Sequence, residues 1–141
     1  MKPHVLLRAA SLLTLIHAVL HTFGGLLHAP SRGPKEAELL SAMKAFQFDA
    51  MGSLRTYWDF YLGFGLFVTV SLVLLAVLMW QLGSLVKVDP AKARPFIASL
   101  TVAFIAIAVL SWAFFFVAPL VTEVLIAVLL GVAYALARPA A

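Results

Sequence analysis

The chain has 141 residues, of which 64% are hydrophobic and 11% charged, and its mean hydropathy is +1.06. Soluble domains carry roughly 45–50% apolar and about 25% charged residues, so this composition excludes a soluble globular protein. An aromatic content of 12% excludes intrinsic disorder, and the absence of cysteine excludes thiolate catalysis, iron–sulfur clusters and a disulfide framework. We therefore expect a small integral membrane protein.

Four apolar runs are long enough to cross a membrane, for which about 20 residues suffice. They cover residues 5–27, 57–82, 96–118 and 120–137. We expect a single all-α domain over residues 1–141, built as a four-transmembrane-helix bundle, with Pro119 serving the turn between the last two spans. The first run is too long for a cleaved signal peptide, and we interpret it as a retained helix.

The loop after the first span carries the signals of a short helix. Pro34 suits the first helical position, and Glu36 and Glu38 suit the positive end of a helix dipole. Four apolar residues then fall on one helical face: Leu39, Leu40, Met43 and Phe46. The pattern predicts an amphipathic helix over residues 35–48 that lies on the outer membrane surface, either as an anchor of the loop or as a lid.

Lysine and arginine residues favour one side of these spans. Six lie at the two termini and between the second and third spans: Lys2, Arg8, Lys87, Lys92, Arg94 and Arg138. Four lie in the first loop: Arg32, Lys35, Lys44 and Arg55. The positive-inside rule therefore predicts that the N-terminus and the C-terminus are cytoplasmic. This topology accounts for the net charge of +4, so we expect no nucleic-acid partner.

Histidines mark the outer part of the first span. At 100° per residue, His17, His21 and His28 fall within about 40° of arc on one helix face. The spacing of His17 and His21 allows them to share a metal ion, zinc or iron. It equally fits two histidines that hydrogen-bond to a neighbouring helix. We expect His28, at the interface, to be solvated.

Two acidic residues lie inside spans, where ionisable groups are costly and point to function. Asp59 can pair with Arg55, four residues earlier on the same helix. Glu123 has no such partner on its own helix and is the best candidate for a functional acid. Tyr61 and Trp112 fit either an interfacial aromatic belt or the wall of a ligand pocket. Connectivity places all these groups, with the histidines, in one leaflet.

The chain resembles a family of small four-span bacterial membrane proteins in three segments: HAVLHTFGGLLH, MGSLRTYWDFYLGFGL and SWAFFFVAPL. The resemblance covers most of the chain. It implies a location in the bacterial inner membrane. Because the activity of that family is uncharacterised, the resemblance implies no reaction, cofactor or functional residue.

We expect a membrane-embedded enzyme or binding protein for a metal, a cofactor or a lipid-soluble ligand, with its site in the extracytoplasmic leaflet. The candidate residues are Glu123 and Asp59 as acid–base groups, Tyr61 and Trp112 as ligand walls, and His17 and His21 as metal ligands. One alternative is a non-catalytic accessory or structural subunit of a larger membrane complex or homo-oligomer. A small transporter is disfavoured, because the sequence shows no internal repeat and the inner leaflet offers no polar path.

Overall fold

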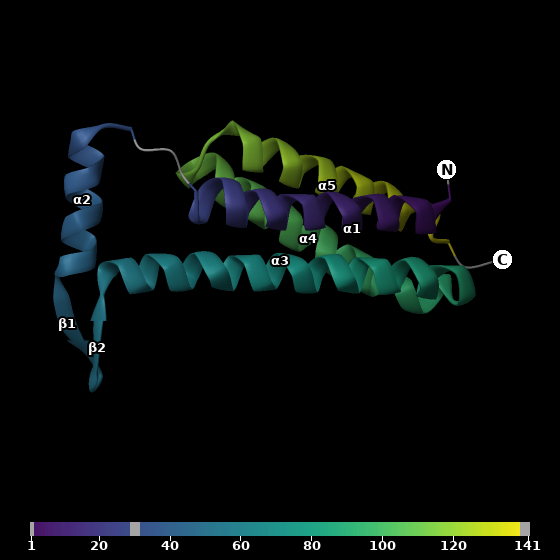
Figure 1. The fold of residues 1–141 in the computed structure, drawn as a ribbon. Helices are drawn as coiled ribbons and strands as arrows, with labels where there is room; N and C mark the ends of the chain where they lie inside the picture. Colours follow the sequence, from purple (N-terminus) through teal and green to yellow (C-terminus); the bar gives the residue numbers. More distant parts are fainter. Residues whose placement is uncertain (1, 29–31, 139–141) are drawn as a thin grey trace. The chain divides into compact units, whose positions relative to one another are not determined.

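The computed structural model describes residues 2–28 and 32–138, and Figure 1 labels their helices and strands. In these residues, four helical segments are long and apolar enough to cross a membrane: α1 with its extension η1 (Pro3–Val19 and Leu20–Leu26), α3 (Tyr57–Val88), α4 (Pro90–Phe114) and α5 (Val117–Leu136). A fifth helix, α2 (Pro34–Ala45), and a hairpin of β1 (Gln47–Ala50) and β2 (Ser53–Thr56) precede α3. These features indicate a multi-pass membrane protein.

The chain forms two compact units. Unit 1 comprises Met1–His17 and Leu72–Ala141, and unit 2 comprises Ala18–Ser71. Unit 1 thus holds most of α1, the second part of α3, and all of α4 and α5, whereas unit 2 holds the end of the first span, α2, the hairpin and the beginning of α3.

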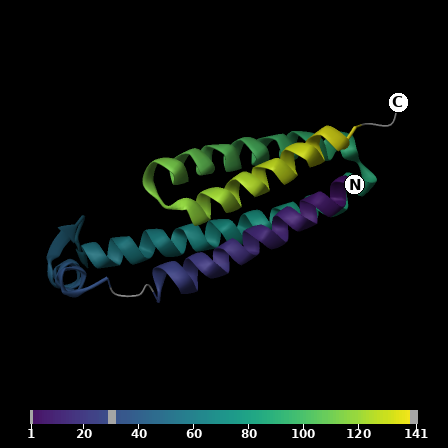
Figure 2. The same ribbon diagram turned by 90° about the horizontal axis from the view of Figure 1, so that it is seen from above.

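The hydrophobic core of unit 1 draws on all of its helices. Its fully buried large side chains are Leu7, Met79, Ile97, Phe104, Ile126 and Leu130. Helices α4 and α5 lie side by side as a hairpin (Figures 1 and 2). The Ser11 hydroxyl on α1 donates a 2.7 Å hydrogen bond to the backbone oxygen of Ala76 on α3. Polar contact therefore supplements apolar packing, as is common between membrane helices.

The connection between α3 and α4 is a single residue, Asp89. Its side chain accepts a 3.0 Å hydrogen bond from the backbone N–H of Lys92 and forms a 3.1 Å ion pair with the Lys92 ammonium group, and Pro90 occupies the first turn of α4. The hydrogen bonds from Lys92 hold the pKa of Asp89 below its usual range. Because of this cap, α3 extends to Val88 and α4 begins at Pro90, so both helices run beyond the expected spans 57–82 and 96–118 at this connection.

Pro119 does not form the turn between the last two spans. The turn consists of Phe115 and Phe116, and the backbone N–H of Phe115 closes α4 on the oxygen of Ser111 at 3.0 Å. Pro119 lies in the first turn of α5, where a backbone N–H has no partner within the helix, so proline is tolerated there. Helix α4 therefore ends at Phe114 and α5 begins at Val117, where the sequence predicted spans over 96–118 and 120–137.

The first span ends in π-helical turns over Leu20–Leu26, where hydrogen bonds join residues five apart. The N–H of Leu27 accordingly donates to the oxygen of Thr22 at 2.9 Å. A rotation of 100° per residue therefore does not hold here. The predicted stripe of His17, His21 and His28 assumed that rotation throughout, and this assumption was wrong. The helical part of the span is Pro3–Leu26 rather than 5–27.

The first loop holds a helix at the expected place, but the helix ends at Ala45 rather than at residue 48, and a hairpin follows. No side chain of α2 is buried, and Leu39 is 60% exposed. The hairpin turns at Met51 and Gly52, which both have positive φ, of 55° and 87°. Two consecutive positive φ values are characteristic of the type I′ turn, which matches the twist of paired strands.

The strain at Met51 gives a direct prediction. Its side chain is fully exposed, so replacement by asparagine, which tolerates positive φ, removes no packing. We expect Met51→Asn to stabilise the hairpin by up to about 1 kcal/mol. Slower amide hydrogen exchange at Gln47–Ala50 and Ser53–Thr56 would confirm this, and unchanged or faster exchange would contradict it.

Candidate functional site

The carboxyl group of Glu123 is buried in the interior of unit 1. Its side chain is 4% exposed, which makes it the one buried acidic residue in the described part of the chain. It lies in the second turn of α5, about 9 Å along the axis from the first residue at ~1.5 Å per residue. Ile126 and Leu130, both fully buried, follow it three and seven residues later on the same face. The apolar face of α5 therefore brings the carboxyl group into the core.

Ser111, near the end of α4, provides the polar surroundings of this carboxyl. Its side chain is 3% exposed and its hydroxyl group interacts with the Glu123 carboxyl. The second carboxyl oxygen, Oε2, is buried and has no hydrogen-bond partner among the described residues. A buried polar group without a partner costs about 1–3 kcal/mol. Retaining Glu123 therefore lowers stability, which is typical of a group kept for function.

A groove of about 550 Å³ runs along the same helix hairpin. From α4 it is lined by Thr101, Ile105, Ala108, Val109 and Trp112, and from α5 by Leu120, Val124, Ala127, Val128 and Gly131. Ala108 and Ala127 are buried, whereas Val109 and Val128 are more than half exposed. Small side chains therefore lie deep in the groove, and larger apolar ones border it. Its volume is within the usual range for ligand pockets.

The acid and the groove are neighbours on both helices. Ser111 lies three residues after Ala108 on α4, and Glu123 lies four residues before Ala127 on α5. Residues at these spacings are one helical turn apart. Trp112, 76% exposed, lines the same groove. The structure thus brings two of the candidates from the sequence, Glu123 and Trp112, to one part of unit 1.

His17 also belongs to unit 1. It lies near the C-terminal end of α1, and its Nδ1 atom is buried. Its side chain as a whole is half-buried. The histidine therefore lies on the packed side of α1, three residues after the fully buried Thr14.

His21 belongs to unit 2, where its ring contacts α3. The Nε2 atom lies 3.0 Å from the backbone oxygen of Gly65, and in the tautomer that places a proton there Nε2 donates to this oxygen. One residue later, the hydroxyl groups of Thr22 and Thr69 are 2.8 Å apart. These contacts favour the interpretation of His21 as a histidine that joins two helices.

Asp59 and Arg55 form no ion pair in residues 2–28 and 32–138, contrary to the expected interaction. Oδ2 of Asp59 instead accepts a 2.8 Å hydrogen bond from the Thr56 N–H, and the Thr56 hydroxyl accepts a 3.1 Å hydrogen bond from the Asp59 N–H. This reciprocal arrangement caps the N-terminus of α3. The Arg55 guanidinium donates to the oxygen of Leu54 at 2.7 Å.

Tyr61 lies in unit 2, on the first part of α3. Its ring is 49% exposed and packs on Trp58, with ring centroids 5.4 Å apart. Trp58 in turn receives the Lys44 ammonium group at 4.5 Å from its ring centroid. Tyr61 does not line the groove between α4 and α5. These contacts agree with an interfacial aromatic cluster.

The described residues contain no set of ligands for the expected zinc or iron site. No group of three or more histidine, aspartate and glutamate side chains there is close enough to hold a metal ion. Zinc sites use three or four protein ligands, so His17 and His21 would need at least one more.

Sequence reasoning did not identify the deep groove residues Ala108, Ala127 and Gly131. Ala127 and Gly131 are four residues apart on one helix, a spacing that indicates close approach by another molecule or helix. The pattern was obscured because small residues occur throughout α4 and α5.

Comparison of the chain with models of known protein families, with curated proteins and with solved structures finds no match.

Proposed function

We propose that the protein binds a lipid-soluble ligand in the groove between α4 and α5, with the Glu123 carboxyl as the acid of the site. The observation that carries this proposal is the buried carboxyl, with one oxygen unpartnered, one helical turn from an apolar groove on the same two helices. A carboxyl group in an apolar environment accepts a hydrogen bond when ionised and donates one when protonated. It can therefore recognise a hydroxyl or carbonyl group on an otherwise apolar molecule, or transfer a proton to it.

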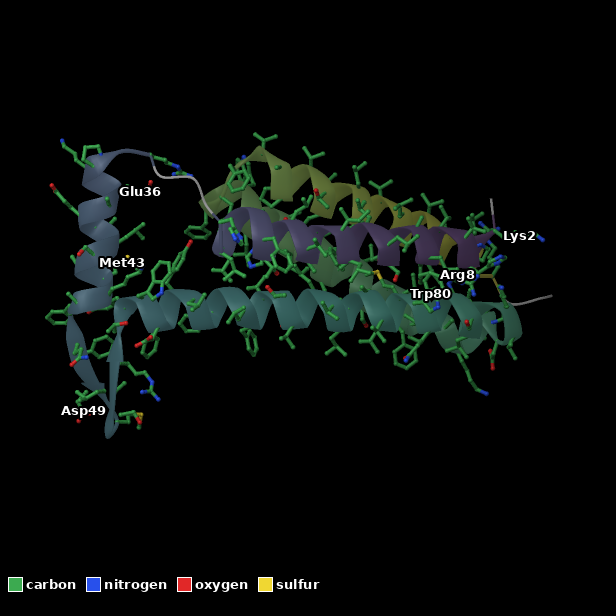
Figure 3. The ribbon with its side chains drawn as sticks, viewed as in Figure 1. Lys2, Arg8, Glu36, Met43, Asp49 and Trp80 are labelled. Carbon is green, nitrogen blue, oxygen red and sulfur yellow. The ribbon has the colours of Figure 1, made fainter. Side chains whose placement is uncertain are left out.

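The proposal includes the location and orientation expected from the sequence: a bacterial inner membrane with both termini in the cytoplasm. In support, the basic residues of unit 1 gather at one end, where α1 begins, α3 meets α4 and α5 ends (Figures 1 and 3). The Arg8 guanidinium lies 4.8 Å from the centroid of the Trp80 ring, and the Arg94 guanidinium lies 4.3 Å from that of Tyr134. Such cation–aromatic pairs are typical of side chains that reach a membrane interface.

Filling the groove tests the ligand site. A Cβ atom on Gly131 would approach the Thr101 Cγ2 atom at an ordinary 3.8 Å, so a larger side chain can extend into the groove. We expect Gly131→Leu to abolish retention of a lipid-soluble molecule by the detergent-purified protein, as measured by mass spectrometry of organic extracts. The matched control is Val132→Leu on the exposed surface next to it, which we expect to retain the molecule.

The role of the acid is tested in the same assay. Glu123→Gln preserves the shape of the side chain but removes its ability to ionise. We expect it to retain the fold and to lose most of the ligand. Equal retention by Gly131→Leu and the wild-type protein would exclude the groove, and equal retention by Glu123→Gln would exclude the acid.

One observation favours a second function, that of a structural subunit. Ala127 and Gly131 in the groove have the spacing of small residues at which transmembrane helices pack closely. A helix from a second copy of the chain would then occupy the groove. Because the protein has no cysteine, Val128→Cys offers a probe without background. A disulfide-linked dimer with Val128→Cys but not with Val132→Cys would support this function, and a monomer in both would support the ligand site.

A further inference from the structure

A second pocket lies in unit 2, where the hairpin meets the beginning of α3. It has a volume of about 550 Å³ and is lined by Ala50, Ser53, Arg55, Asp59, Phe60, Gly63, Phe64 and Phe67. Its charged residues, Arg55 and Asp59, come before its three phenylalanines in the sequence, and the phenylalanines follow along α3. The pocket is therefore amphipathic.

The charged end lies at the expected level of the lipid headgroups. Arg55 is the second-last residue of β2, immediately before α3 begins its apolar course at Tyr57. Tyr57, Trp58 and Tyr61 occupy the first turns of α3, as aromatic residues do at a membrane interface. Phe64 and Phe67 are 67% and 71% exposed and lie one and two turns further along. A lipid with its headgroup at Arg55 would thus extend its acyl chain along the phenylalanines.

The two charges have free capacity for a ligand. Among the described residues, the one hydrogen bond of the Arg55 guanidinium is to the backbone oxygen of Leu54, and the guanidinium has further donors. The Asp59 carboxylate accepts a hydrogen bond from Thr56 at Oδ2 and can accept more. A cation and an anion that line one pocket match a headgroup that carries both signs. Gly63 leaves room beside them, because a Cβ atom there would meet nothing within 4 Å.

We propose that this pocket binds a zwitterionic phospholipid whose headgroup carries a primary ammonium group. The phosphate group pairs with the Arg55 guanidinium, and the ammonium group donates hydrogen bonds to the Asp59 carboxylate. One acyl chain lies over Gly63 against Phe64 and Phe67. A quaternary ammonium headgroup has no N–H to donate, and a glycerol headgroup has no positive charge, so both bind more weakly.

The test is native mass spectrometry of the purified full-length protein, titrated with phosphatidylethanolamine, phosphatidylcholine and phosphatidylglycerol of identical acyl chains. We expect phosphatidylethanolamine to bind about tenfold more tightly than the other two, because one charge-assisted hydrogen bond distinguishes it. Arg55→Gln should weaken all phospholipids. Asp59→Asn, whose amide oxygen can still accept from Thr56, should remove the preference for phosphatidylethanolamine.

Gly63→Phe fills the pocket while Arg55 and Asp59 remain in the chain, and we expect it to weaken all three lipids. Val68→Phe, on an exposed position of the same helix outside the pocket, is the matched control and should bind like the wild-type protein. Equal affinity for the three headgroups would overturn the proposal. A preference for phosphatidylglycerol would overturn it as well, because the site would then respond to negative charge alone. So would an undiminished preference in Asp59→Asn.

Discussion

Replacing Glu123 with methionine should stabilise the protein while abolishing its function. The methionine side chain has similar length and needs no hydrogen bond, so the substitution removes a buried oxygen that has no partner in the described structure. The Ser111 hydroxyl, left without the carboxyl, can bond to the backbone oxygen four residues earlier in α4. We expect the free energy of unfolding to rise by about 1–3 kcal/mol, as measured by denaturation in mixed detergent micelles.

A suitable comparison is Ile126→Ala, three residues later on the same buried face. This substitution creates a cavity and should lower the free energy of unfolding by about 2–5 kcal/mol. If Glu123→Met were destabilising to the same extent, the carboxyl group would be a structural element of unit 1 rather than a group retained for function. The functional readout, ligand retention, should be lost in Glu123→Met and kept in a conservative core variant such as Leu130→Met.

The second large effect is expected at Gly65 on α3. A Cβ atom there would overlap the Leu26 side chain, which is 7% exposed. The backbone oxygen of Gly65 also lies 3.0 Å from His21 Nε2 and accepts a 3.2 Å hydrogen bond from Thr69. We expect Gly65→Ala to separate the helices locally and to destabilise unit 2 by about 1–3 kcal/mol.

Gly63 provides the control for this prediction, because it lies two residues away on the same helix and a Cβ atom there has open space. Gly63→Ala should be neutral or stabilising by up to about 1 kcal/mol, since alanine favours the helix. Hydrogen exchange of the amides in Leu20–Leu26 gives the readout for both variants. Equal exchange in Gly65→Ala and Gly63→Ala would contradict the close approach of Leu26 to α3.

The number of apolar helices could be predicted from the sequence because each span needs a long apolar run. The ends of these helices could not be predicted in the same way. Asp89 and Pro90 together form a cap signal that a search for apolar residues passes over, since both lie outside the expected apolar runs. The prediction for Pro119 was wrong because a local signal was given too much weight. Proline suggests a turn between helices, yet it is equally suited to the first turn of a helix.

The hairpin and the π-helical turns were harder to foresee. The turn at Met51 and Gly52 lacks the usual asparagine or aspartate at its first central position, so its sequence does not predict a type I′ turn. The π-helical turns have no sequence pattern that we could use, although His21 and the glycines Gly24 and Gly25 lie within them. Both features depend on local backbone geometry rather than on hydrophobic pattern.

The candidate site was foreseen in part. Glu123 stood out because an acid inside an apolar run has a high cost, and the structure places it in the core of unit 1. Asp59 also lies inside an expected span, and the sequence predicted that it pairs with Arg55, but its bonds with Thr56 cap α3. The groove required knowledge of which faces of α4 and α5 pair, and small residues alone do not reveal this.

The most direct test is a crystal structure of the full-length protein grown from a lipidic mesophase. We predict continuous density for an elongated ligand in the α4–α5 groove, in contact with Ala108 and Ala127, with a polar group within hydrogen-bonding distance of the Glu123 carboxyl. A groove occupied by a helix of a second copy, with Glu123 remote from any ligand, would contradict the proposed function.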